Sequence, residues 1–151
     1  MTFWRDQPLS ALTQEQWESL CDGCGRCCLH KIDDGREIAF TCVACRLLDI
    51  DSVRCRHYSE RSERVPECVV LSPDNLAQTA PALPRTCAYR LLHEGADLPD
   101  WHPLVSGDSN SVRAAGVSVS ELAVPASRVR RTDSLSCYVT DLYTPPGESG
   151  C

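Results

Sequence analysis

Four cysteines within eight residues make the octet Cys21–Cys28 the part of the chain best suited to chemistry. Its order, Cys-Asp-Gly-Cys-Gly-Arg-Cys-Cys, contains two consecutive C-x-x-C steps. A tight turn brings residues i and i+3 together, so three sulfurs can point at one tetrahedral ion or one corner of a cluster. Gly23 and Gly25 suit such a turn because glycine takes a positive φ without steric cost. We therefore expect a thiolate metal site here.

Cys28 has two interpretations, because adjacent side chains in an extended backbone diverge. It either ligates a second centre or shares the first one through a kinked backbone. A ribbon-like zinc site of Cys24, Cys27, Cys42 and Cys45 is an alternative, since its two C-x-x-C pairs are separated by 14 residues. That spacing is one residue short of the usual zinc pattern. The ribbon would leave Cys21 and Cys28 unexplained, so we rank it second.

The cysteine count and the N-terminal sequence favour a reducing compartment. The 151 residues include 11 cysteines, an odd number, and the first 20 residues contain no apolar run typical of a secretory signal. We therefore expect a cytoplasmic protein in which bound metal adds stability that a thin apolar core cannot supply. No stretch approaches the apolar length that crosses a bilayer, so no membrane partner is expected.

The charge distribution argues against a nucleic-acid partner. The formal net charge is −6, and only one of the 15 basic residues is a lysine. The two densest basic clusters, residues 54–64 and 128–131, contain or adjoin acidic residues, which is typical of a solvated, ion-paired face. The remaining partner class is an unidentified protein that meets the face formed by residues 54–64.

No catalytic motif stands out, and we do not expect the chain to be an enzyme by itself. It contains no G-x-S-x-G, P-loop or dinucleotide fingerprint. A thiol oxidoreductase could use Cys24 and Cys27, with Arg26 lowering the pKa of a thiolate, but it would leave the other sulfurs without a role. We expect structural or solvent-exposed roles for the histidines and for two tryptophans: His30, His57, His93, His102, Trp17 and Trp101.

Short elements must position the cysteines. Thr13 and Gln16 predict a capping box, which begins a helix that carries Trp17 and ends at Cys21. The segment 29–41 predicts a β-hairpin, because an Asp-Gly turn separates two short apolar runs. These two elements enclose the octet.

The downstream part of the chain also predicts short elements. Ser72 as N-cap and Pro73 as first residue predict a short helix through Thr79. Helical spacing predicts a second helix over 85–93, which Gly95 stops.

The expected fold is α+β: a small, irregular, metal-stabilised domain with short helices and a β-hairpin. We place this domain at 1–125 and a C-terminal extension at 126–151. Residues 117–122 predict a strand, and the composition of residues 144–150 predicts a disordered tail.

The octet and the landmarks that follow it resemble the YcgN/YkgJ-type CxxCxxCC cysteine-cluster family of bacterial proteins. The landmarks extend over residues 3–125 and include VACR (43–46), CRHY (55–58), PEC (66–68), TCAYRLL (86–92) and LPDWHPL (98–104). That family is described as zinc- or iron-chelating, with iron–sulfur clusters as one form. The resemblance implies this ligand set: Cys21, Cys24, Cys27, Cys28, Cys45, Cys55, Cys68 and Cys87. In that family the position of Cys42 need not be cysteine, and the resemblance does not extend to Cys137 or Cys151.

The leading hypothesis is a cytosolic metal-binding protein whose cysteine thiolates hold zinc or an iron–sulfur cluster. All-thiolate ligand sets suit both, so the ligands do not discriminate between them. An iron–sulfur redox or electron-transfer protein is one alternative, and a metal-scaffolded adaptor for a protein partner is another.

Overall fold

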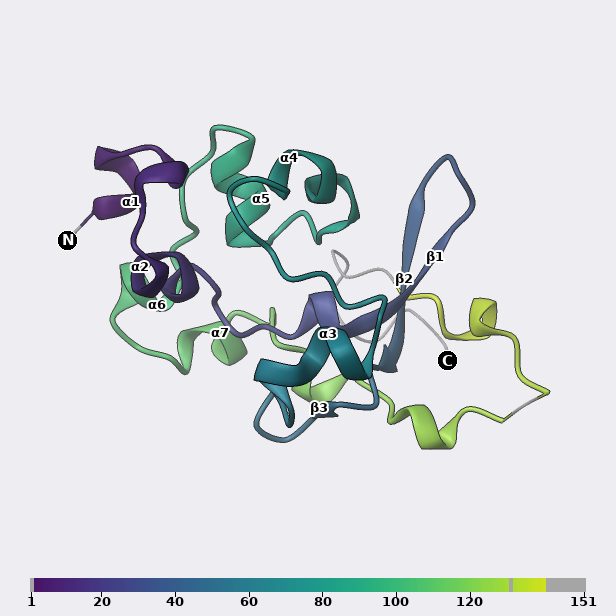
Figure 1. The fold of residues 1–151 in the computed structure, drawn as a ribbon. Helices are drawn as coiled ribbons and strands as arrows, with labels where there is room; N and C mark the ends of the chain where they lie inside the picture. The colour runs from purple at the N-terminus through teal and green to yellow at the C-terminus, as the bar shows by residue number, and fades with distance from the viewer. Residues whose placement is uncertain (1, 131, 141–151) are drawn as a thin grey trace.

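The computed structural model describes residues 2–130 and 132–140. Within this part of the chain the strands form two small antiparallel sheets, and all helices are short (Figure 1). The helices are Phe3–Asp6 (α1), Gln14–Ser19 (α2), Arg61–Arg64 (α3), Leu76–Thr79 (α4), Ala88–His93 (α5), Pro103–Ser106 (α6) and Ser111–Ala114 (α7). The strands are Leu29–Asp33 (β1), Ile38–Ala44 (β2), Leu48–Asp49 (β3) and Arg54–Cys55 (β4). The predicted α+β class, with short helices and a hairpin, is confirmed, and the tail predicted at 144–150 lies outside the described residues.

The helix before the octet begins as predicted. The Thr13 hydroxyl accepts a hydrogen bond from the Gln16 backbone N–H at 3.1 Å, and the Gln16 side-chain oxygen accepts one from the Thr13 backbone N–H at 3.0 Å. This reciprocal capping box satisfies two donors that the helix would otherwise leave free. The helix α2 ends at Ser19, two residues before Cys21, and its Trp17 is buried. The chain therefore enters the octet from a fixed direction.

The segment after the octet folds into the predicted hairpin. β1 pairs antiparallel with β2, with Lys31 opposite Phe40 and an irregular register near the start of β1. The Asp34 carboxylate accepts backbone hydrogen bonds within the turn, and Gly35 has a φ of +85°. Both features are typical of tight turns between strands. Figure 1 shows the tip of the hairpin projecting away from the helices.

The start predicted for α4 is wrong. Ser72 is not an N-cap; its backbone N–H donates to the Asn75 side chain at 2.9 Å, and the Asn75 amide donates to the Val70 carbonyl at 2.8 Å. These bonds close a turn at residues 73–75, so the helix begins only at Leu76. Its end at Thr79 agrees with the prediction.

The helix predicted over 85–93 begins later than expected and stops where expected. Pro84 and the following residues form a turn in which the Cys87 N–H donates to the Pro84 carbonyl at 3.0 Å, so α5 starts at Ala88 with Cys87 as its N-cap. Beyond the end of α5, Gly95 adopts a φ of +83° and donates to the Leu92 carbonyl at 3.2 Å. This is the left-handed stop that the sequence predicts.

The strand predicted over 117–122 is wrong. Residues Val119–Glu121 form a 3₁₀ turn, and the Ser118 hydroxyl accepts from the Ser120 N–H at 3.3 Å to cap it. Serine competes with strand pairing in this way because its hydroxyl offers the backbone a local partner. The fully buried Val119 instead donates its N–H to the Cys24 carbonyl at 2.9 Å. This segment therefore packs against the octet rather than joining a sheet.

The buried apolar residues form separate clusters. The helical cluster consists of Trp4, Trp17, Leu20, Leu76, Ala80, Leu83, Ala88, Tyr89 and Leu98. The sheet cluster consists of Leu29, Phe40, Ala44, Leu48, Val53 and Val119, and a third group joins Cys24 to Val112 and Val117. Cys87 packs against the helical cluster, whereas Cys28 packs against the sheet cluster. Predicted ligands thus touch every one of these clusters.

The strand β2 is bonded along both edges. β1 covers one edge, and on the other edge Val43 forms a parallel bridge with Val124 while Thr41 forms an antiparallel bridge with Val139. The Val124 N–H donates to the Cys42 carbonyl at 2.7 Å. The Cys42 side chain is buried in this part of the hairpin.

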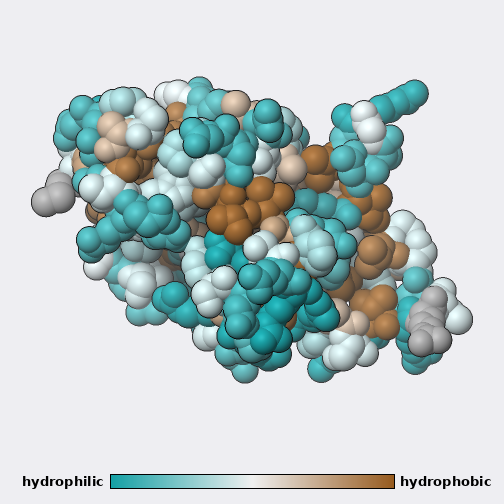
Figure 2. Space-filling model, in the orientation of Figure 1, coloured by the Kyte–Doolittle hydropathy of each residue, from teal (hydrophilic) through white to brown (hydrophobic). Residues whose placement is uncertain are grey.

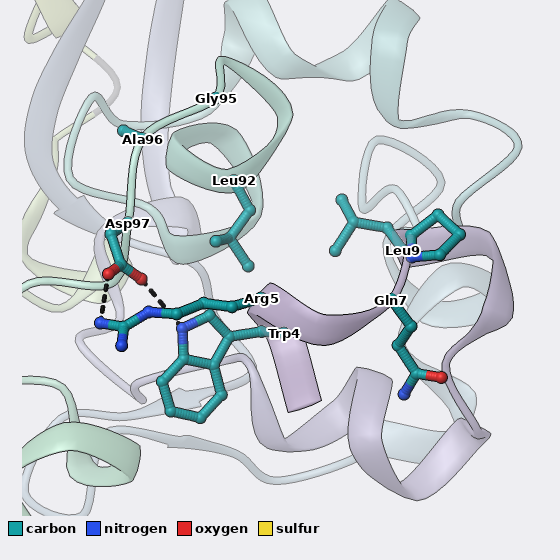
Figure 3. Close-up of a pocket in the computed structure, with 9 residues that line it drawn as sticks. Trp4, Arg5, Gln7, Leu9, Leu92, Gly95, Ala96 and Asp97 are labelled. Atoms are coloured by element: carbon teal, nitrogen blue, oxygen red, sulfur yellow. Dashed lines mark hydrogen bonds and ion pairs between the residues drawn. The ribbon is translucent and has the colours of Figure 1, made fainter. Parts of the chain in front are cut away.

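An aspartate after α5 holds the N-terminal helix in place. Figure 3 shows a pocket in which the Asp97 carboxylate faces Trp4 and Arg5 of α1. It accepts a hydrogen bond from the Trp4 indole N–H at 2.9 Å and another from the Arg5 guanidinium. The bond from Arg5, followed by that from Trp4, lowers the pKa of Asp97 to about 2.

Replacing Asp97 with asparagine is expected to loosen α1. A carboxyl with a lowered pKa stabilises the fold above its ordinary pKa of about 4, and this contribution disappears as the pH falls through about 2. Hydrogen exchange of the α1 amides should therefore increase in Asp97→Asn at pH 7 and differ little from the parent at pH 2. Asp100→Asn, in the same loop, is the control, and equal exchange in both variants at pH 7 would contradict the assignment.

Candidate metal centre

The eight cysteines implied as ligands come from five segments of the chain. The octet supplies four of them, between α2 and β1. Cys45 follows β2, Cys55 ends β4, Cys68 lies between α3 and α4, and Cys87 caps α5. Any shared site therefore depends on the tertiary fold and not on one local motif.

The octet turns tightly, as its glycines predict. Gly23 and Gly25 have φ values of +73° and +78°, and a 3₁₀ turn follows at Arg26–Cys28. The Asp22 carboxylate accepts from the Cys24 N–H at 3.0 Å, and the Cys28 N–H donates to the Gly25 carbonyl at 3.0 Å. These hydrogen bonds hold the backbone of the octet in a tight turn.

Sulfurs at one end of the octet interact with the cysteine that caps α5. Cys21 keeps an exposed surface, but the protein around its sulfur desolvates the thiolate. This desolvation, followed by the charge of Cys27, raises the pKa of Cys21 to about 12, and Cys87 contributes to the same shift. Burial raises the pKa of Cys87 to about 11, and the charge of Cys27 acts in the same direction. Burial is also the main reason that the pKa of Cys24 lies well above its ordinary value. Without a cation these thiols keep their protons at neutral pH.

Cys27 and Cys28 share a hydrogen bond between their side chains. This bond is the main reason that the pKa of Cys27 falls to about 7 and that of Cys28 rises. Lys31 also lowers the pKa of Cys27, whereas the Arg26 guanidinium donates to the Val117 carbonyl at 2.8 Å. The thiolate role considered for Arg26 is thus replaced by a structural one.

The remaining cysteines join the network through Cys28 and Cys68. The charges of Cys45 and Cys68 help to raise the pKa of Cys28. Burial is the main cause of the raised pKa of Cys68, and the charges of Cys27, Cys45 and Cys55 add to it. All eight predicted ligands therefore belong to one connected set of interacting thiols.

The segment that carries Cys68 crosses the molecular surface without regular structure. Val69 and Val70 beside it are exposed by 54% and 46%, which is unusual for large apolar residues. Figure 2 shows hydrophobic residues gathered in the middle of the face where the chain between α3 and α4 passes in Figure 1. Cys68 thus reaches the other thiols from a surface segment.

Asp22 is the acidic residue that sequence reasoning missed. Its Oδ2 atom is buried and accepts no hydrogen bond from the described residues. The Asp22 charge helps to raise the pKa of Cys21, Cys24 and Cys87, and it opposes the lowering of the pKa of Cys27. A buried carboxylate oxygen without a donor is costly, and a nearby cation would satisfy it. Its position between Cys21 and Cys24 is visible in the sequence, but the burial of its oxygen is not.

The thiols do not close around a metal in this conformation. Across residues 2–130 and 132–140, no three His, Cys, Asp or Glu side chains are arranged so that they could hold an ion. The donor chemistry nevertheless fits a thiophilic metal, because sulfur donors predominate and an unsatisfied carboxylate oxygen adjoins them. Side-chain rotation would have to bring the sulfurs together, so the ligand set stays a prediction.

His102 and Trp17 have the structural roles that the sequence predicts. His102 is fully buried, and its Nδ1 accepts from the Leu104 N–H at 3.0 Å. The ring proton therefore lies on Nε2, which donates to the Leu20 carbonyl at 2.8 Å. The Trp17 and Tyr89 rings pack at a centroid distance of 4.7 Å.

The arginine-rich face at residues 54–64 is partly ion-paired, as predicted. Arg64 donates to the Glu60 carboxylate at 2.9 Å, and the Arg61 guanidinium lies 3.9 Å from the centre of the Tyr58 ring. Both pairs are exposed, so each contributes little to stability.

No helix within the described ranges has the length and apolar character needed to span a membrane. The fold and the candidate site together define a small α+β protein whose centre is rich in cysteine thiols. Comparison with known proteins then places the chain among its relatives. It belongs to the UPF0260 family of bacterial proteins.

The similarity extends over most of the chain. It is 47% identical over 148 residues to a UPF0260 protein of Gluconobacter oxydans, covering 97% of this chain and 86% of the relative. It is 52% identical over 132 residues to one from Shewanella amazonensis, covering 86% and 90%. No family model and no solved structure matches the chain. The names of these relatives specify neither a ligand nor a cysteine-cluster type.

Proposed function

We propose that this protein binds a thiophilic metal, as zinc or an iron–sulfur cluster, in the cytoplasm. The ligands would be Cys21, Cys24, Cys27, Cys28, Cys45, Cys55, Cys68 and Cys87. The observation that carries the proposal is that thiols from five chain segments interact with one another, and that a buried Asp22 oxygen without a donor among the described residues lies beside Cys21, Cys24, Cys27 and Cys87. The eight cysteines of the proposed ligand set are free thiols, which suits a reducing compartment.

Electrostatics explains why a metal is the expected occupant. Cys21, Cys24 and Cys87 have raised pKa values because burial and neighbouring negative charge oppose ionisation. A bound metal cation reverses that balance, since it neutralises the thiolates and is held by them. Because each ligand must lose its proton, affinity should rise with pH over the neutral range.

Metal analysis of anaerobically purified protein tests this proposal. We expect bound zinc, or iron with matching acid-labile sulfide. Cys24→Ser and Cys68→Ser should each lower the metal content and the soluble yield, whereas Cys137→Ser should change neither. Cys137 is the matched control because it lies in the 3₁₀ turn Leu135–Tyr138 and outside the predicted ligand set. Metal-free parent protein, or equal metal loss in all three variants, would contradict the proposal.

Electron transfer through an iron–sulfur centre is a second candidate. Cys21 and Cys27 retain exposed surface although they belong to the interacting set. An exposed ligand brings a cluster close to a redox partner. A visible absorption band that bleaches reversibly on reduction would support this candidate, and colourless zinc protein would exclude it.

A further inference from the structure

We propose that a cavity lined by β3 and the segment 123–128 binds a small monocarboxylate with an apolar body. The cavity has a volume of about 560 Å³, which lies in the range of small-molecule sites. Its lining comes from three places in the sequence: residues in the range 44–51, Arg56 directly after β4, and residues in the range 123–128. This second site requires no metal, so it stands or fails separately from the proposed metal-binding function.

Backbone hydrogen bonds hold the walls of the cavity in place. The Ala44 N–H donates to the Val124 carbonyl at 2.9 Å, which fixes the segment 123–128 to the end of β2. β3 pairs antiparallel with β4, and the Arg56 N–H extends this contact by donating to the Leu47 carbonyl at 2.8 Å. The cavity therefore exists before any ligand binds, which lowers the entropy that binding costs.

Apolar side chains form part of the lining. Ala44 and Leu48 are only 1% and 4% exposed. Ile50, Pro125 and Ala126 are partly buried and line the same cavity. A ligand with an apolar body would remove these side chains and its own carbon atoms from water, which is favourable. The lining therefore favours an organic ligand over a small hydrated ion.

Two arginines in the lining have donors available to such a ligand. Arg56 and Arg128 are exposed, and within residues 2–130 and 132–140 neither guanidinium makes a hydrogen bond or an ion pair. Arg46 also lines the cavity, but its guanidinium donates to the Arg64 carbonyl. A guanidinium binds a carboxylate through two parallel hydrogen bonds. Arg56 and Arg128 are therefore the residues that we expect to hold the ligand carboxylate.

Two aspartates in the lining limit the charge of the ligand. Asp49 and Asp51 line the cavity, and the Asp49 carboxylate accepts a hydrogen bond from the Ser52 hydroxyl at 2.8 Å. The three arginines and two aspartates of the lining leave one formal positive charge. A single carboxylate balances this charge, whereas the second negative charge of a phosphate would be repelled by the aspartates.

Titration of the full chain with hexanoate, followed by the NMR shifts of the backbone amides, tests this proposal. We expect saturable binding that shifts the amides of the cavity lining. Binding should be roughly tenfold weaker in Arg56→Gln and in Arg128→Gln, because each loses a charge-assisted hydrogen bond. Arg54→Gln and Arg130→Gln are the matched controls, since each removes the same charge from an exposed arginine two residues away and outside the lining.

Two outcomes of this titration would overturn the proposal. One is the absence of saturable binding, and the other is equal weakening in the control variants. Ala126→Leu adds a test that does not alter charge, because the larger side chain would occupy part of the cavity. It should weaken hexanoate binding, and unchanged binding would show that hexanoate does not occupy this cavity.

Hexanol and inorganic phosphate test the two parts of the ligand separately. Hexanol keeps the apolar body without the charge, and phosphate keeps a negative charge without the apolar body. Each should bind at least roughly tenfold more weakly than hexanoate, because each loses one class of contact. Hexanol binding as tight as that of hexanoate would overturn the role of Arg56 and Arg128. Equally tight phosphate binding would overturn the monocarboxylate specificity. Neither result bears on the metal content of the protein.

Discussion

Gly25→Ala is expected to lower the free energy of unfolding by about 2–5 kcal/mol, which is a large part of the stability of a small domain. Gly25 has a φ of +78°, a conformation that strains any residue with a Cβ. A Cβ at this position would also lie 2.4 Å from a Val53 methyl and 2.7 Å from a Val119 methyl. Both valines are buried in the sheet cluster, so neither can move aside freely. Chemical denaturation followed by circular dichroism measures the loss.

Gly23→Ala is the matched control for this substitution. Gly23 has a similar φ of +73°, but a Cβ there would meet no described atom within 4 Å. Only the backbone strain remains, so we expect a loss of about 1–2 kcal/mol. Equal losses in the two variants would show that the close approach of Val53 and Val119 to Gly25 is unimportant.

Arg26→Met is expected to lower the free energy of unfolding by about 2–3 kcal/mol. Arg26 is only 4% exposed, and its guanidinium donates to the Val117 carbonyl and the Thr86 hydroxyl. Methionine fills much of the same space but leaves both acceptors without this donor. Because Arg26 holds the octet against the start of α5, bound metal should fall as well.

Arg113→Met provides the comparison for Arg26. Arg113 also donates to a backbone carbonyl, that of Asp51, but its side chain is exposed. Water can replace that bond, so a change of less than about 1 kcal/mol is expected. Urea denaturation and metal analysis of both variants make the measurement. A loss in Arg113→Met as large as that in Arg26→Met would contradict the importance of burial.

Local signals in the sequence were sufficient where neighbouring residues decide the structure. The capping box of Thr13 and Gln16, the turn at Gly35 and the left-handed Gly95 all form as predicted. Predictions failed where a side chain or a distant segment competes with the local pattern. Asn75 closes a turn before α4, and Val119 bonds to the octet instead of extending into a strand.

The candidate site shows the same division. The spacing of the octet predicts a local thiol site, and spacing also brings in Cys45 through the ribbon-like alternative, whereas Cys55, Cys68 and Cys87 enter only through family resemblance. Their spacing along the chain carries no information on proximity, since contacts such as that between Tyr89 and Trp17 decide it. Asp22 could not be distinguished from a solvated turn aspartate, because the burial of its oxygen depends on the whole fold.

The two bonded edges of β2 also bear on self-association. An unpaired strand edge can template pairing with another chain, and apolar strands are the most hazardous. β2 contains the buried Phe40 and Val43, and segments around Val124 and Val139 occupy the edge that β1 leaves open. A chain shortened before Val124 would present this edge to its neighbours. The segments around Val124 and Val139 therefore shield the hairpin from intermolecular strand addition.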